Sequence, residues 1–423
     1  MTSHRLRGLS LTLPLIAFLG VTFVAPLVAM FTRSIHEPLV ADALPQTLAL
    51  LQEWDGQSTP DEELFQSLAM EGLALHRDRS LGAVATRINR LESGMRSTIV
   101  GTFRKLNRLP VTDLHGISQQ LPGDSEQILN QQDDGTHLLE DYWKAAMIDA
   151  KQDWSEPASW LAIRRAGERF TFRHYLNALD LDRDETGTIV AQPPERRIYL
   201  VLLWRTLVVS VFITMICLLL GYPVAYLIAN APPHRSTLFL MLVLVPFWTS
   251  LLVRTTSWIV LLQTHGVIND LLTTVGLISD DGRIAMIYNM TGTMVAMVHV
   301  LLPFMILPLY SVMSTIPPLH LQAAESLGAS PLQAFLRVYW PQSLPGVAAG
   351  SLLVFILSIG YYITPALVGG RTGQLISNLI AYHMQQSLNW GLAAALSVIL
   401  LVCVAVLYIV YSRLVGVERM RLG

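Results

Sequence analysis

The stretch IPPLHLQAAESLGASPLQAFLRVYWPQSLPG, residues 316–346, lies between two long apolar segments and carries the punctuation of a helical hairpin. The prolines at 317 and 318 suit the first turn of a short helix, where a missing N–H has no helical partner to lose. Gly328 suits the left-handed residue that ends such a helix. The stretch therefore predicts two helices joined by a glycine turn, with a long apolar segment on each side.

The second helix of this hairpin is expected to begin with Ser330 as its N-cap and Pro331 in its first turn. Pro341 is expected to stop it, because proline cannot donate the next helical hydrogen bond. Apolar residues at i, i+3, i+4 and i+7 predict a single stripe that something must bury. These residues are Leu332, Phe335, Leu336 and Tyr339.

This helix-glycine-helix segment resembles the EAA loop of permease subunits of type I ABC importers, the family that shares the maltose- and methionine-permease core. The matching residues are Gln322, Ala323, Ala324, Leu327, Gly328, Ala329, Pro341, Pro345 and Gly346. The resemblance implies that the loop docks in a cleft on a cytoplasmic ATPase and passes its closure to the membrane helices. The family's usual glutamate is replaced by Gln322, and Glu325 follows one helical turn later. By this resemblance the ATPase-coupling residues are Gln322, Ala323, Ala324, Glu325, Leu327, Gly328, Ala329 and Phe335.

The composition indicates a membrane protein, since 52% of the 423 residues are apolar and only 14% are charged. Six apolar stretches reach the ~20 residues that a bilayer crossing needs. They lie near residues 9–32, 198–230, 237–262, 286–313, 345–366 and 391–412. The first stretch is expected to be a retained helix, because it is too long for a signal peptide and contains two prolines.

The positive charges predict the orientation of these spans, because short cytoplasmic segments are enriched in Lys and Arg. The arginines that flank the spans on one side are Arg5, Arg7, Arg235, Arg337, Arg413, Arg419 and Arg421. Both termini and the hairpin are therefore expected in the cytoplasm, and the protein in the inner membrane.

Residues 33–197 form a polar block of domain size, with 26 acidic and 18 basic residues and hence a net charge of −8. Helical patterns cover residues 81–106, 138–154 and 160–179. The block is expected outside the membrane, either as a cap that contacts a binding protein or ligand or as a helical decoration. Its histidines lack the spacing of metal ligands and its carboxylates form no catalytic pair, so no metal, cofactor or catalytic site is expected. These histidines are His76, His115, His137 and His174.

Several membrane segments are similar to the spermidine/putrescine branch of these permeases. They are GYPVAY at 221–226, LVPFWTSLLVRT at 244–255 and LLPFMILPLY at 301–310. Prolines 223, 246, 303 and 308 each remove a helical hydrogen bond and invite a kink of the kind an alternating-access gate uses.

Aromatic and hydroxyl side chains beside kinks predict the translocation pathway, since they can bind an alkylammonium group without a formal charge. The residues with these properties are Trp248, Thr249, Tyr362 and Thr364. Arg205, Arg254 and His299 are the ionisable residues within the spans, where such residues often mark a functional site. For each arginine, a side chain that snorkels to the outer surface is an equally open interpretation. For His299, a neutral ring bonded to a neighbouring backbone is the commoner interpretation, and lining of the pathway is the alternative.

The source of energy is expected to be a separate protein. The spans contain no Asp or Glu, which argues against a proton-driven secondary transporter. No GxxxxGK[ST] loop is present, so the chain itself is not expected to be an ATPase or another enzyme.

The expected fold is an all-α membrane protein with six transmembrane helices, a type I ABC importer (MetI-like) core and a helical extracytoplasmic insert. Its expected parts are residues 1–32, 33–197 and 198–423. The resemblance implies as partners a cytoplasmic ABC ATPase dimer, a second permease subunit and an extracytoplasmic solute-binding protein, within a lipid bilayer and without nucleic acid. The implied solute is a polyamine or a related amine or amino-acid-like compound. A membrane receptor with an outer sensor domain and a secondary transporter are the alternatives.

Overall fold

The computed structural model describes residues 12–108, 142–183 and 188–415. They divide into two compact units, one formed by residues 35–172 and the other by the flanking parts of the chain. Two of the four insert histidines, His115 and His137, and four of the flanking arginines, Arg5, Arg7, Arg419 and Arg421, lie outside the described residues.

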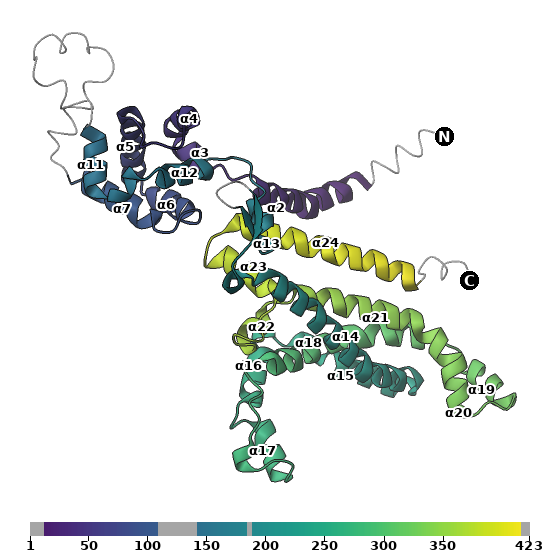
Figure 1. Ribbon diagram of the computed structural model, residues 1–423. Helices are drawn as coiled ribbons and strands as arrows, with labels where there is room; N and C mark the ends of the chain where they lie inside the picture. The colour runs from purple at the N-terminus through teal and green to yellow at the C-terminus, as the bar shows by residue number, and fades with distance from the viewer. Residues whose placement is uncertain (1–11, 109–141, 184–187, 416–423) are drawn as a thin grey trace, which may run out of the picture. The chain divides into compact units, whose positions relative to one another are not determined.

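The 35–172 unit is a bundle of short helices (Figure 1). They are α3 (Leu39–Ala43), α4 (Pro45–Glu53), α5 (Glu62–Arg77), α6 (Leu81–Asn89), α7 (Met95–Leu106), α11 (Tyr142–Ala150), the 3-10 turn η2 (Gln152–Ser155) and α12 (Pro157–Ala166). Their apolar faces meet in one core, within which Phe65, Trp154 and Trp160 are fully buried.

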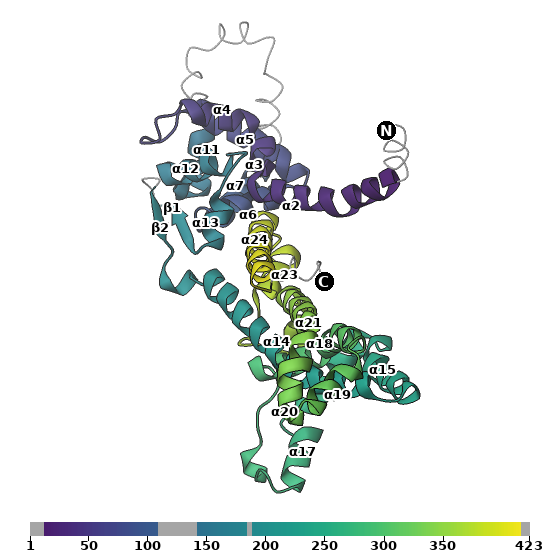
Figure 2. The ribbon, with the colours of Figure 1, turned by 90° about the vertical axis from the view of Figure 1, so that its right-hand side faces the viewer.

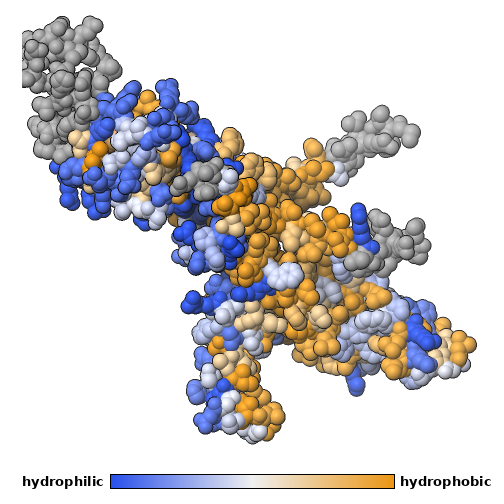
Figure 3. Space-filling model, in the orientation of Figure 1, coloured by the Kyte–Doolittle hydropathy of each residue, from blue (hydrophilic) through white to orange (hydrophobic). Residues whose placement is uncertain are grey.

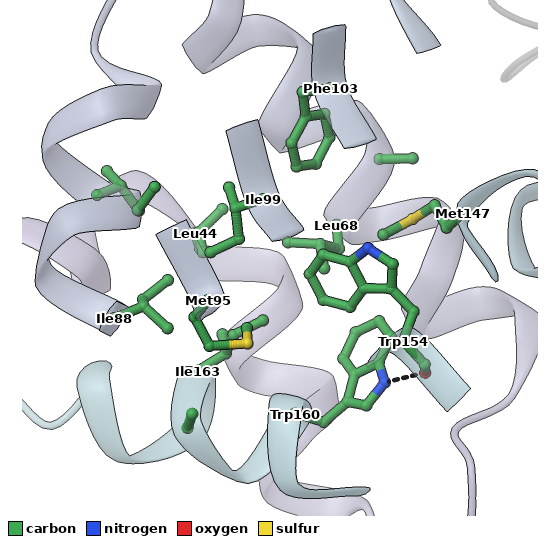
Figure 4. Packing of buried hydrophobic residues seen from close by; sticks show 14 of the residues in the cluster. Leu44, Leu68, Ile88, Met95, Ile99, Phe103, Met147, Trp154, Trp160 and Ile163 are labelled. Atoms are coloured by element: carbon green, nitrogen blue, oxygen red, sulfur yellow. Dashed lines mark hydrogen bonds between the residues drawn. The ribbon is translucent and has the colours of Figure 1, made fainter. Parts of the chain in front are cut away.

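Tryptophan packing fixes the centre of that core (Figure 4). The rings of Trp154 and Trp160 lie 5.2 Å apart, and Phe65 meets Trp160 edge-on at 4.6 Å. Each indole N–H is satisfied: Trp154 donates to the Thr102 hydroxyl (2.8 Å) and Trp160 to the Trp154 carbonyl (2.9 Å). Buried indoles need such partners, so this core specifies one arrangement.

The predicted 81–106 and 160–179 helical patches are interrupted. Of the 138–154 patch, residues 138–141 lie outside the described residues and the rest forms α11 and the 3-10 turn η2. The 81–106 pattern is divided into α6 and α7 by a turn at Arg90–Gly94, where Gly94 has a φ of 100°. The 160–179 pattern breaks after Ala166, and its second part, α13 (Arg173–Ala178), belongs to the other unit. Apolar periodicity continued across both breaks, which is why the sequence did not reveal them.

The second unit contains the long apolar helices. They are a first helix at Thr12–Ile35 whose last part is α2 (Ala25–Ile35), α14 (Tyr199–Asn230), α15 (Pro233–Trp248), α16 (Leu251–Leu262), α18 (Met290–Met313), α21 (Trp340–Gly360) and α24 (Trp390–Val415). Five helices in the described chain are long and apolar enough to cross a membrane, or six if one bent pair counts as a span. The surface over these helices is largely hydrophobic (Figure 3). The predicted all-helical membrane fold is confirmed.

Helices α14, α18 and α21 form the centre of this unit (Figure 2). α21 approaches α18 closely at Gly350, where an added Cβ would lie 2.9 Å from the Met305 sulfur and 3.1 Å from the Met305 carbonyl oxygen. Small residues permit this contact, which is how helices commonly associate in a bilayer.

The third predicted span, 237–262, is not one helix. α15 and the helical segment that starts at Leu251 are bent by 94° at a break around Thr249 and Ser250, both of which have extended backbone. Pro246 precedes the break and removes a helical hydrogen bond there. A hydropathy window does not detect such a break because both halves are apolar.

The segment after α16 projects as a small hairpin that contains α17 (Val267–Thr274) and the turn η4 (Asp280–Gly282) (Figure 1). Asn269 is buried and its amide bonds both the N–H and the carbonyl of Ile284 (3.1 and 2.9 Å). Arg283 pairs with Asp270 at 2.7 Å and Asp280 at 2.9 Å, hydrogen bonds that raise the pKa of this guanidinium. Polar contacts thus fix the shape of the hairpin.

Short elements complete the unit. They are η3 (Pro194–Arg196), α22 (Ile363–Val368), α23 (Ile376–Gln385) and the antiparallel strands β1 (Leu181–Arg183) and β2 (Ile189–Ala191). Asp180 precedes β1 and accepts hydrogen bonds from the N–H groups of Ile198, Tyr199 and Leu200 at 2.9 to 3.1 Å. A carboxylate at the N-terminus of α14 satisfies N–H groups that the helix leaves free.

Candidate functional site

The hairpin predicted from the sequence is present at residues 316–346. Its first helix is α19 (Pro318–Ser326), and Gly328 takes the predicted left-handed conformation with a φ of 89°. Ser330 caps the second helix through a capping box: its hydroxyl accepts from the N–H of Gln333, whose side chain accepts from the N–H of Ser330. His320 and Gln342 link the two helices at 2.9 Å. The predicted turn at Gly328 and the predicted N-cap at Ser330 are confirmed, whereas the contact between His320 and Gln342 was not predicted.

The predicted end of the second helix at Pro341 is wrong. α20 (Pro331–Ala334) continues through a π-helical turn, η5 (Phe335–Tyr339), directly into α21, so that residues 331–360 form one helix. Within the π turn the N–H of Trp340 bonds the carbonyl of Phe335, five residues back. The wider turn changes the hydrogen-bond register just before Pro341, which has no N–H to donate, and the helix continues past it. The hairpin is therefore continuous with a membrane helix.

The same π turn divides the predicted apolar stripe, because one extra residue per turn rotates the residues that follow it. Leu332 and Leu336 are exposed, whereas Tyr339 is buried and Phe335 is half-buried. The expectation of one stripe facing a partner is corrected: the two aromatic residues pack inside this chain.

Those aromatic residues pack against α14 and tie the hairpin to the centre of the unit. Phe335 meets Tyr222 at 6.2 Å and Tyr226 at 5.8 Å, and Tyr339 meets Tyr226 at 5.1 Å. Tyr222 also bonds the Ser343 hydroxyl at 2.9 Å. The apolar pattern of the hairpin gave no indication that Tyr222 and Tyr226 contact it; their i, i+4 spacing in GYPVAY was the available signal.

The outer surface of the hairpin carries most of the residues that the EAA resemblance selects. Leu327, at the tip, is 89% exposed, and Gly328 beside it is also exposed. Gln322, Ala323 and Glu325 are exposed on α19, and Ala324 and Ala329 are half-buried. An almost fully exposed leucine at a rigid turn is suited to entering a pocket on another protein.

The two predicted pathway residues in the third span lie at its break. Trp248 is the last residue of α15 and is 78% exposed, and Thr249 is exposed and bonds the Pro246 carbonyl at 2.9 Å. Arg254 follows one turn into α16 and reaches back to the Thr249 carbonyl at 3.4 Å. The break thus gathers an indole, a hydroxyl and a guanidinium.

The other two predicted pathway residues lie at the start of α22. Tyr362 is partly exposed, and its carbonyl accepts from the Asn378 amide at 2.7 Å. Thr364 is fully buried, and its hydroxyl oxygen has no hydrogen-bond partner among the described residues. Thr364 therefore does not line an open surface of this chain in this conformation, and a pathway role for both residues stays a prediction.

The remaining ionisable residues in the spans have local partners. His299 accepts a hydrogen bond at Nδ1 from the Trp258 indole at 3.1 Å, and Arg205 donates to the Thr372 carbonyl at 3.2 Å. Across the described ranges no group of three His, Cys, Asp or Glu side chains could hold a metal ion.

The family model for "Binding-protein-dependent transport system inner membrane component" matches residues 221–416, a range that contains both the hairpin and the broken span. The solved structure of a bacterial ABC transporter that imports the polysaccharide alginate is similar with a TM-score of 0.45 and 16% identity, over 66% of this chain and 97% of that one.

Several curated proteins are more similar in sequence to this chain than that transporter is. The spermidine/putrescine transport system permease protein PotB of Haemophilus influenzae is 38% identical over 216 residues, which cover 51% of this chain and 75% of the relative. PotB of Escherichia coli K12 is 36% identical, with 51% and 78% covered. The inner membrane ABC transporter permease protein YdcU of Escherichia coli K12 is 32% identical, with 50% and 70% covered. The chain therefore belongs to the family of binding-protein-dependent transport system inner membrane components, the permease subunits of ABC importers.

Proposed function

We propose that the chain is a permease subunit of a polyamine importer and that its hairpin, residues 316–346, couples it to a cytoplasmic ATPase that hydrolyses the ATP. The observation that carries the coupling role is the exposed Leu327 at a turn held by Gly328 and Ser330. The second helix of the hairpin continues into α21, so in this proposal a displacement of the hairpin is passed directly to a membrane helix.

The substrate class is proposed from the relatives, two of which are named as spermidine/putrescine permeases. Trp248 supports the same choice, because an exposed indole in a membrane segment can bind an ammonium group by a cation-π contact. A second permease subunit and a solute-binding protein outside the membrane complete the proposed importer, since the family is defined as binding-protein-dependent. Trp248, Thr249, Tyr362 and Thr364 are proposed to line or border its pathway.

The orientation belongs to the same proposal. Both termini and the hairpin face the cytoplasm and the 35–172 unit faces outward, as the arginine distribution favours. The chain is not itself an enzyme in this scheme.

Uptake of radiolabelled spermidine by the assembled importer in proteoliposomes tests the proposal. Leu327→Asp should abolish both ATPase association and uptake, because a charge at the tip cannot enter an apolar pocket. Ile189→Asp, on the exposed strand β2, is the matched control and should change neither. Parental uptake by the Leu327→Asp importer would refute the coupling role, and uptake of no polyamine by the parental importer would refute the substrate class.

A further inference from the structure

Two phenylalanines are exposed where the chain leaves the 35–172 unit. Phe170 is 70% exposed and Phe172 is 61% exposed, which makes them the two most exposed large apolar side chains among the described residues of that unit. By contrast, Phe65, Trp154 and Trp160 are fully buried in its core. Neighbouring large rings that are left outside a core mark contact with something apolar.

The segment that carries these rings pairs with the end of the first membrane helix. The N–H of Thr171 donates to the Ile35 carbonyl at 2.8 Å, and the N–H of Glu37 donates to the Arg169 carbonyl at 2.9 Å. Ile35 is the last residue of α2 and hence of the first apolar helix. The exposed rings are therefore fixed within one or two residues of the point where that helix ends.

Both rings share one face of the paired segment. Phe170 lies opposite His36 in the antiparallel bridge, with their ring centroids 5.0 Å apart. Side chains alternate along a paired, extended segment, so Phe172 is on the same face as Phe170. Arg169 precedes this face and is occupied within the protein, where it pairs with Asp42 at 3.0 Å. The face itself is thus apolar.

Two membrane spans end together just before Ile35. The guanidinium of Arg33 lies over the ring of Trp390, 5.5 Å from its centroid, and Trp390 is the first residue of α24. The Ser34 hydroxyl bonds the Tyr175 hydroxyl at 2.7 Å. Trp, Tyr and long basic side chains are typical of the membrane–water interface, because their apolar parts remain in lipid while their polar ends reach water. The chain therefore crosses this interface next to the pairing.

We infer that Phe170 and Phe172 form a lipid-contact surface, which enters the interfacial region of the outer leaflet and holds this connection of the 35–172 unit against the membrane. The surface is continuous with the first apolar helix, none of whose membrane window is buried by this chain. It is too small for a folded partner, since two such rings offer at most about 300–500 Å², whereas a stable protein interface buries ~800 Å² on each partner. The outer side follows from the proposed orientation, on which contact with lipid does not depend.

Photo-crosslinking in the complete importer, reconstituted in lipid nanodiscs with its solute-binding protein, tests the contact. p-Benzoylphenylalanine at position 170 or 172 keeps an aromatic side chain and should form an adduct with phospholipid, identified by mass spectrometry. Met70, which is 45% exposed on α5 of the same unit, is the control position and should form none. Adducts of positions 170 and 172 with a protein in place of phospholipid would overturn the inference, as would an equal yield of lipid adducts at position 70.

Spin labels measure the depth of the same positions without a photoreaction. A nitroxide is attached to Phe170→Cys or Phe172→Cys in a chain that also carries Cys217→Ser and Cys403→Ser. Oxygen concentrates in lipid and a nickel chelate stays in water, so the ratio of their collision rates should be several-fold higher at both positions than at Met70→Cys. A ratio equal to that at Met70→Cys would place the rings in water. Low collision rates with both reagents would show that protein covers them. Either result would refute the lipid contact.

Polyamine uptake by the unmodified importer is measured separately. Normal uptake without contact between these rings and lipid would remove this inference alone. Lipid contact in an importer that takes up no polyamine would remove only the proposed substrate class.

Discussion

Gly328 is the residue whose conformation the hairpin depends on most directly. Its φ of 89° is in the left-handed region, and an added Cβ would meet no atom within 4 Å. A substitution therefore introduces backbone strain without a clash. Valine should cost ~1–2 kcal/mol in this conformation, and the turn should relax by moving the tip. We expect Gly328→Val to lower the amount of ATPase that copurifies with the complex.

Asparagine separates strain from side-chain size at this position, because it tolerates the left-handed region better than other residues do. Gly328→Asn should keep most of the ATPase association. Gly94→Val is the matched control, since Gly94 also has a positive φ and open surroundings but lies in the 35–172 unit. If the same amount of ATPase copurified with the Gly328→Val complex and with the parental complex, Gly328 would not be needed for docking.

At the scale of elements, the aromatic contacts between α14 and η5 connect the hairpin to the centre of its unit. Phe335→Leu removes two edge-on aromatic contacts, with Tyr222 and Tyr226, each worth ~0.5–1.5 kcal/mol. Because the exposed tip is unchanged, the ATPase should still bind. We expect more ATP to be hydrolysed per polyamine imported in proteoliposomes, while Phe31→Leu, on the exposed first helix, should leave this ratio unchanged. An unaltered ratio for Phe335→Leu would show that the contacts only stabilise the fold.

The elements also show what a sequence reveals and what it does not. Capping at Ser330 and the turn at Gly328 were predictable because each depends on neighbouring residues only. The π turn at 335–339 and the break at 249–250 were not, since both depend on how prolines are accommodated against packed neighbours. The exposure of Leu332 and the burial of Tyr339 follow from that turn. The position of the hairpin was predictable from its local turn and capping residues. Which of its side chains are exposed and which are buried could be learned only from the structure.

At the scale of the whole molecule, the 35–172 unit has its own core and should fold without the membrane helices. Residues 35–172 produced alone should unfold cooperatively on heating, followed by circular dichroism. Trp160→Ala should lower the free energy of unfolding by ~3–5 kcal/mol, because Trp160 is fully buried against Phe65 and Trp154. Phe170→Ala is the control, since Phe170 is exposed. A broad, uncooperative transition of the parental unit would show that its core needs the rest of the chain.

We expect the 35–172 unit to lie outside the membrane, a placement that fixes the orientation of the whole chain. Long polar blocks cross a membrane largely regardless of their charge, whereas Arg235 and Arg337 in short segments hold those segments in the cytoplasm. Ser58 in the unit and Ser314 beside the hairpin are both exposed. Ser58→Cys in intact cells should react with a membrane-impermeant maleimide, and Ser314→Cys should react only after permeabilisation. The native Cys217 and Cys403 lie within spans, and the parental chain measures their background. Labelling of Ser314→Cys but not Ser58→Cys in intact cells would reverse the orientation. It would also place the hairpin where no cytoplasmic ATPase could reach it, so the coupling proposal depends on this result.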